Sequence, residues 1–130
     1  MKINKPDHIA INTVDIEQSV LFYKEMLGFK ELKRIPNGDS TLVYMDCGCG
    51  TTIELFDWKG NCSSFCMDDA KSGIAHFAFD VTDIEKWNEH LIEKGAQFTL
   101  PLCKLEHLNK NVLLIKDPNG AVIELCEDIK

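Results

Sequence analysis

Apolar and polar positions follow the same succession twice along this chain. Residues 7–19, DHIAINTVDIEQS, and residues 75–87, AHFAFDVTDIEKW, each run from a histidine through alternating apolar positions to Asp-Ile-Glu. The interval between His8 and His76 is the same as the interval between Asp15 and Asp83. Self-similarity of this kind predicts two copies of one structural unit.

Helical periodicity follows the alternation in both copies. In the first, Asp15 is the expected N-cap residue, Gln18 completes a capping-box pattern, and Gly28 stands where a helix should end. In the second, Asp83 and Gly95 occupy the same places. The apolar stripes are Ile16, Val20, Tyr23 and Leu27 in the first copy and Ile84, Trp87 and Leu91 in the second. Each copy is therefore predicted to contain a strand followed by a helix of about three turns.

Three further strand patterns follow each predicted helix. They lie at 29–35, 40–46 and 51–57 in the first copy and at 97–102, 111–117 and 121–127 in the second. Turn-forming residues separate them, as at 36–39 and 117–120. We therefore expect an α+β fold of two tandem βαβββ modules. A single module leaves one sheet face uncovered, so the modules are expected to pair, within one chain or between chains.

The first module is expected at about residues 5–57 and the second at about 74–128, joined by a polar linker at about 58–73. The whole chain, residues 1–130, is long enough for one domain with a sizeable core. A formal net charge of −7 argues against nucleic-acid binding, which needs a basic surface. No segment has the length of a membrane span or the pattern of a secretory signal, so we expect a cytoplasmic protein.

Six cysteines bear on redox state and metal binding: Cys47, Cys49, Cys62, Cys66, Cys103 and Cys126. In a cytoplasmic protein they are expected to be reduced. Cys47 with Cys49, or Cys62 with Cys66, has the spacing of half a zinc site. Neither pair has a second well-spaced Cys or His pair nearby. Buried or incidental thiols are the favoured interpretation, and the pattern assigns these four cysteines no role.

Strand parity places four ionisable side chains on matching faces of the predicted sheets. His8 and His76 alternate with the apolar positions of the first strand of each copy, while Glu54 and Glu124 each stand between two apolar residues in the last. If the apolar faces pack against the helices, two imidazoles and two carboxylates occupy the opposite faces. This donor set suits a divalent metal ion. The alternative is that all four are solvent-facing residues, duplicated with the repeat and without function.

The chain resembles the vicinal oxygen chelate superfamily, which includes glyoxalase I, methylmalonyl-CoA epimerase, fosfomycin-resistance proteins, extradiol dioxygenases and bleomycin-binding proteins. The similarity runs from DHIAINTVDIEQSVLFYKEMLGF to DPNGAVIELCE and covers essentially the whole chain. It implies paired modules wrapped into a cup-shaped mixed sheet with the helices on the outer face. It also implies that one divalent ion, such as Ni, Zn, Mn, Fe or Co, is bound by His8, Glu54, His76 and Glu124.

Within the superfamily, the His/Glu/His/Glu set is most similar to glyoxalase I, the lactoylglutathione lyase. That resemblance implies a metal-dependent lyase or isomerase that moves a proton between adjacent carbons of a thiohemiacetal or related carbonyl compound. Glu124 would be the catalytic base, and Glu54 could share the task because the modules are pseudo-symmetric. The expected partners are a small-molecule substrate and a second copy of the chain in a homodimer.

Two positions depart from the glyoxalase I pattern. Asn12 stands where bacterial enzymes carry an arginine that holds a carboxylate of glutathione, and Trp58 replaces an asparagine. Losing the cationic anchor removes a charge-assisted hydrogen bond to glutathione, so the sequence does not identify the thiol that the enzyme would use. The alternatives are an enzyme similar to methylmalonyl-CoA epimerase, a thiol transferase similar to the fosfomycin-resistance enzymes, and a non-catalytic drug-binding protein of the bleomycin-resistance type.

Overall fold

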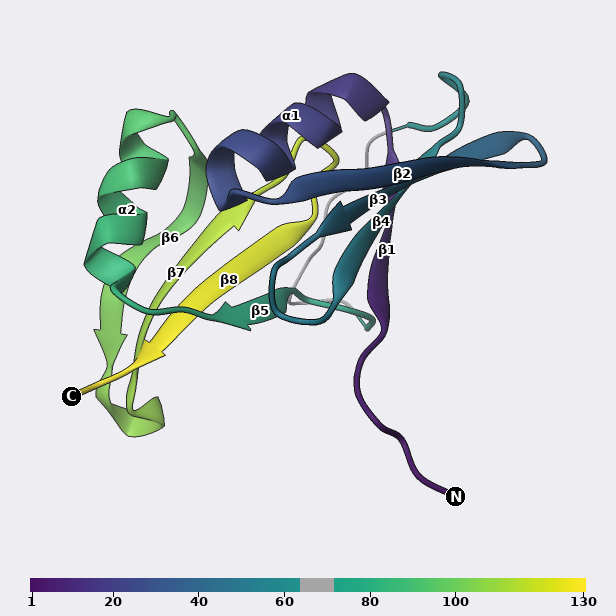
Figure 1. The fold of residues 1–130 in the computed structure, drawn as a ribbon. Coiled ribbons are helices and arrows are strands. Elements are labelled where there is room, and N and C mark those ends of the chain that lie inside the picture. The colour runs from purple at the N-terminus through teal and green to yellow at the C-terminus, as the bar shows by residue number, and fades with distance from the viewer. Residues whose placement is uncertain (64–71) are drawn as a thin grey trace. The chain divides into compact units, whose positions relative to one another are not determined.

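The computed structural model describes residues 1–63 and 72–130, and the chain divides into two compact units, Met1–Ser64 and Phe65–Lys130. Each unit contains a four-stranded sheet and one α-helix (Figure 1). The predicted α+β class and the tandem βαβββ succession are therefore confirmed. The middle of the predicted linker, with Cys66, lies outside the described residues.

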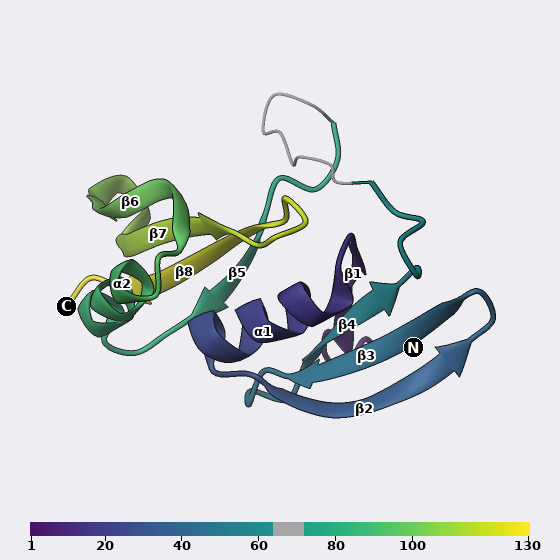
Figure 2. The same cartoon turned by 90° about the horizontal axis from the view of Figure 1, so that it is seen from above.

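The first unit consists of β1 (His8–Thr13), α1 (Ile16–Leu27), β2 (Lys30–Asn37), β3 (Ser40–Asp46) and β4 (Thr52–Asp57). Its strands are ordered β1-β4-β3-β2, with β1 parallel to β4 and the other neighbours antiparallel. The helix α1 packs on one face of this sheet, against β2 and β4 (Figure 2). The strand residues buried in this core include Ile11, Val43, Met45, Ile53 and Leu55.

The second unit repeats this plan. It consists of β5 (Phe77–Asp80), α2 (Ile84–Glu93), β6 (Gln97–Leu105), a one-turn 3₁₀ helix (Glu106–Leu108), β7 (Lys110–Lys116) and β8 (Val122–Asp128). The strand order is β5-β8-β7-β6, and β5 is parallel to β8. The helix α2 packs against β7 and β8. No helix in the described ranges is long and apolar enough to cross a membrane.

The helix α1 begins and ends where the pattern predicts. The Asp15 carboxylate accepts a hydrogen bond from the backbone N–H of Gln18 at 3.0 Å. Gly28 has φ +70°, and its N–H donates to the carbonyl of Lys24 at 3.0 Å. A left-handed residue after the last turn is common at helix ends because it lets the chain satisfy the final carbonyls. Tyr23, in the middle of the predicted stripe, is fully buried.

The helix α2 begins at the predicted place but with a different cap. Asp83 is the N-cap residue, as predicted, but it has φ +61° and its side chain makes no capping hydrogen bond. The carboxylate of Glu127, at the end of β8, accepts from the N–H of Asp83 at 3.0 Å and of Ile84 at 3.1 Å. A neighbouring strand thus satisfies N–H groups that a helix start leaves unpaired.

Glu127→Ala should therefore destabilise the protein by about 0.5–2 kcal/mol, the usual range for losing a helix cap. Glu127→Gln keeps one acceptor oxygen and should lose less. Urea denaturation followed by circular dichroism measures both changes. Glu89→Ala, at an exposed position in the middle of α2, is the matched control. Equal midpoints for Glu127→Ala and this control would contradict a stabilising role for the contact.

Two strands run further than predicted, and each contains a proline that its edge position accommodates. β2 continues through Pro36 to Asn37, which shortens the turn between β2 and β3 to two residues. Gly38 in this turn has φ +61°. β6 continues through Pro101 to Leu105, with shifts of register along its pairing with β7. Both strands lie at the edge of their sheet, where a residue without an N–H removes no necessary ladder bond.

Candidate functional site

Each unit brings together one histidine and one glutamate of the four predicted ligands. In the first unit, Nε2 of His8 on β1 lies 3.6 Å from Oε2 of Glu54 on β4. In the second, Nε2 of His76, which immediately precedes β5, lies 3.1 Å from Oε2 of Glu124 on β8. In both cases the histidine stands two residues before the residue that pairs with the glutamate across a parallel ladder. We call these two pairs the half-sites.

The half-sites lie on the sheet faces opposite the helices, as strand parity predicts. Along β1, Ile11 and Thr13 are buried, while His8, Ala10 and Asn12 are exposed. The two glutamates differ in solvent access. The side chain of Glu54 is 8% exposed and that of Glu124 is 20% exposed. The second half-site therefore offers the more accessible carboxylate.

A carboxylate on the preceding residue orients the first histidine. Nδ1 of His8 lies 2.8 Å from Oδ2 of Asp7. An ionised carboxylate only accepts hydrogen bonds, so Nδ1 carries a proton, and Nε2 is the ring nitrogen that faces Glu54. This hydrogen bond, more than the charge of Glu54, raises the pKa of His8, and it lowers the pKa of Asp7. Histidines that bind metals commonly have such a partner.

The two half-sites differ in what surrounds them. The residue before His76 is Ala75, so the second half-site has no carboxylate in the place of Asp7. Across the β3–β4 ladder Glu54 pairs with Tyr44, and hydrogen bonding with the Glu54 carboxylate raises the pKa of the Tyr44 phenol. At the matching place in the second unit, Leu114 pairs with Glu124. The first half-site is therefore the more polar and the more constrained.

The separations within the half-sites suit ligands of a divalent ion. Two donors at the usual bond lengths from one ion lie about 3.0–3.5 Å apart, close to the two observed distances. A direct ion pair between a protonated imidazole and a carboxylate would have a similar separation. No group of three or more His, Cys, Asp or Glu side chains suited to a metal occurs among the described residues, so each half-site presents two donors.

The two positions that depart from the glyoxalase I pattern contact each other. Nε1 of Trp58 donates to Oδ1 of Asn12 at 2.7 Å. The indole also stacks on Phe56, with ring centroids 5.6 Å apart and the planes inclined by 16°. Phe56 pairs with Asn12 across the β1–β4 ladder. Strand alternation in the sequence indicates that Asn12 faces the same side as His8. The contact between Asn12 and Trp58 is visible only in the structure.

The described cysteines are all free thiols. Burial raises the pKa of Cys47 to about 12, so this thiol stays protonated at neutral pH. Burial is also the main cause that raises the pKa of Cys126, whose Sγ lies 3.6 Å from the carbonyl oxygen of Phe79. Neither thiol has the low pKa of a nucleophilic cysteine.

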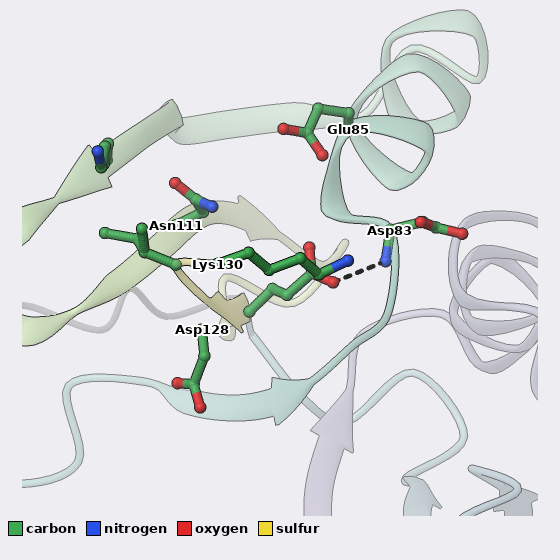
Figure 3. Close-up of a pocket in the computed structure, with 8 residues that line it drawn as sticks. Asp83, Glu85, Asn111, Asp128 and Lys130 are labelled. Carbon is green, nitrogen blue, oxygen red and sulfur yellow. Dashed lines mark hydrogen bonds between the residues drawn. The ribbon is translucent and has the colours of Figure 1, made fainter.

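A cavity of about 300 Å³ lies in the second unit, beside the start of α2 (Figure 3). It is lined by Asp83, Glu85, Lys104, Asn111, Glu127, Asp128, Ile129 and Lys130. The four predicted metal ligands are not among these residues. Two of its carboxylates have structural partners: Glu127 caps α2, and Asp128 accepts from Lys110 at 2.6 Å. The cavity is therefore separate from the half-sites.

Residues 5–125 match the glyoxalase/bleomycin resistance protein/dioxygenase superfamily. The chain belongs to this superfamily. The match includes all four half-site residues and ends within β8, and it confirms the resemblance that the sequence indicated.

Relatives of this glyoxalase-superfamily protein carry names for different reactions. A probable lactoylglutathione lyase from Synechocystis sp. is 25% identical over 122 residues, which cover 92% of each chain. The mitochondrial methylmalonyl-CoA epimerase of Dictyostelium discoideum is 28% identical over 133 residues, covering 96% of this chain and 79% of the relative. The crystal structure of a glyoxylase/bleomycin resistance protein/dioxygenase domain from Frankia sp. EAN1pec has a TM-score of 0.84 at 24% identity, covering 98% and 93% of the two chains. The Frankia structure supports the fold alone.

Proposed function

We propose that this protein is a metal-dependent lyase or isomerase of the glyoxalase I type. The four ligands of one divalent ion would be His8, Glu54, His76 and Glu124, supplied by two half-sites of one chain or of a homodimer. The observation that carries the proposal is the approach of imidazole nitrogen and carboxylate oxygen to 3.6 Å and 3.1 Å in two equivalent places. Membership of the superfamily and the similarity to a probable lactoylglutathione lyase support the reaction class.

The donor set fits such an ion, which when bound would act as a Lewis acid towards negative charge developing on a substrate oxygen. The protein's own groups perform the remaining tasks. Asp7 holds the His8 ring through Nδ1, so that Nε2 keeps its direction. The more accessible carboxylate, Glu124, would accept a proton from the carbon beside a carbonyl and return it to the adjacent carbon. Glu54, shielded beside Tyr44, would serve as a positioned ligand.

A second candidate is epimerisation of an acyl thioester, favoured by the 28% identity to methylmalonyl-CoA epimerase. This reaction also removes and returns a proton on a carbon next to a carbonyl group, so the same carboxylate would act as base. The two candidates differ in substrate and in the carbon that receives the proton. They share the requirement for the four ligands.

A metal assay combined with a substrate screen tests the proposal. The purified protein is stripped with a chelator, reloaded with Ni, Zn, Mn, Fe or Co, and its metal content is measured by mass spectrometry. Turnover is then followed with methylglyoxal plus glutathione or other thiols, with methylmalonyl-CoA and with fosfomycin. We expect isomerisation of a methylglyoxal–thiol adduct that is lost on chelation and recovered on reloading. A protein that binds none of these ions, or that binds a drug equally well without them, would contradict it.

A further inference from the structure

We propose that the stacked side chains of Phe56 and Trp58 form a recognition platform for a flat, uncharged group of the substrate. The inference deepens the proposed function, since it concerns the molecule handled beside the His8–Glu54 half-site. It concerns binding, so it can be tested without turnover.

The platform is held in a fixed orientation before any ligand arrives. The two rings lie 5.6 Å apart at an angle of 16°, and both side chains are only half-buried. The hydrogen bond from Trp58 Nε1 to Asn12 Oδ1, 2.7 Å long, restrains rotation of the indole. A flat ligand that stacks on a restrained ring loses less conformational entropy than one that must order it. An aromatic pair in an offset-stacked or edge-on arrangement is stabilised by more than its buried apolar area alone provides.

The platform shares its sheet face with the first half-site. Phe56 follows Glu54 by two residues on β4, and Asn12 follows His8 by four residues on β1. Residues two apart on a strand point to the same side and are separated by about 7 Å. A small molecule with a carbonyl group at the half-site could therefore extend a conjugated or aromatic substituent onto the rings.

The second unit shows that the sheet does not need these rings in order to form. Its equivalent of the Asn12–Phe56 pair is Asp80 paired with Cys126. There, Lys110 lies 3.9 Å from a carboxylate oxygen of Asp80 and 2.6 Å from one of Asp128. The same register position therefore carries an ionic cluster in one unit and an aromatic stack in the other, so this sheet plan accommodates either.

Charge favours an uncharged ligand over an anionic one. The ammonium group of Lys59, next to Trp58 in sequence, lies 3.0 Å from the Asp57 carboxylate and donates to Thr41. The ammonium of Lys33 lies 4.9 Å from the centre of the Tyr44 ring. Both cations are thus already engaged, and the chain as a whole has a net charge of −7. A carboxylate placed on the platform would meet little compensating charge.

Nuclear magnetic resonance of the full chain labelled with ¹⁵N tests the proposal, because its two tryptophans give two indole N–H signals. The probes are acetophenone, the non-planar cyclohexyl methyl ketone and the anionic 4-acetylbenzoate. We expect acetophenone to shift the Trp58 signal saturably, with a dissociation constant about 2- to 12-fold lower than that of either other probe. The signal of Trp87, on α2, should not move and serves as the internal control.

Phe56→Leu should remove the preference for acetophenone, whereas Phe98→Leu, in the second unit, should retain it. An unchanged circular dichroism spectrum verifies folding, and Asn12→Ala, which releases the indole, is the second variant should Phe56→Leu not fold. Equal binding of the two uncharged ketones, or tighter binding of 4-acetylbenzoate, overturns the platform. A Trp58 response without turnover of any compound overturns only the proposed function, and turnover without that response overturns only the platform.

Discussion

Glu124→Gln is expected to abolish turnover while the fold is retained. General base catalysis by a positioned side chain contributes about 10²–10⁴-fold to rate, and an amide cannot take up the proton. The substitution conserves shape, and the side chain is 20% exposed, so little packing is lost. The effect should appear in kcat measured with a methylglyoxal–thiol adduct on metal-saturated protein, with the circular dichroism spectrum unchanged.

Two further Glu→Gln variants make this test specific. Glu54→Gln should weaken metal binding more than it lowers kcat at saturating metal, because Glu54 is shielded and lies beside Tyr44. Glu89→Gln, at an exposed position on α2, should change neither quantity. Full activity of Glu124→Gln combined with loss of activity in Glu54→Gln would assign the base to the first half-site. Full activity in both would refute the carboxylate mechanism.

The second large effect is expected at the histidines. His8→Ala and His76→Ala should each weaken metal binding by more than about 100-fold, because losing a residue that merely orients a ligand already costs 10–100-fold. The control is His90→Ala, a helix residue whose ring contacts Trp87 edge-on at 6.2 Å. Titration against a chelator of known affinity measures all three variants. An unchanged affinity in either ligand variant would remove that histidine from the metal site.

Combining the histidine variants asks whether the half-sites serve one ion. If four ligands hold a single ion, each single variant removes nearly all metal binding. The double variant with both His8→Ala and His76→Ala then loses little more. If each half-site binds its own ion with two ligands, each single variant leaves half of the bound metal. Residues that act as a unit give such non-additive effects. Metal stoichiometry in the single variants therefore separates the two arrangements.

Much of the fold was predictable because the repeat and the side-chain periodicity agree. Local residues delimit the helix at 16–27, with Asp15 and Gly28 at its ends. Strand parity predicted that His8 and Glu54 share a sheet face, because alternation alone selects the face. Their approach to 3.6 Å depends in addition on β1 pairing with β4, which the apolar pattern does not specify. That all four ligands bind one ion stays a prediction.

What the sequence did not predict depends on contacts between residues far apart in the chain. The cap of α2 comes from Glu127, 44 residues beyond Asp83, and no local pattern identifies it. The pairing of Tyr44 with Glu54 needs the ladder register, which the apolar pattern alone does not specify. Asp7 was the exception, since it directly precedes His8 and could have been recognised as the partner of a ligand histidine.

In the described chain, every strand of each sheet comes from that sheet's own half of the sequence. Two copies of the protein could therefore exchange whole halves without breaking any ladder hydrogen bond. Both histidine–glutamate pairs would stay intact in such an exchange, because each pair lies within one unit. The four proposed ligands of one ion would then come from two chains, and metal binding would depend on protein concentration.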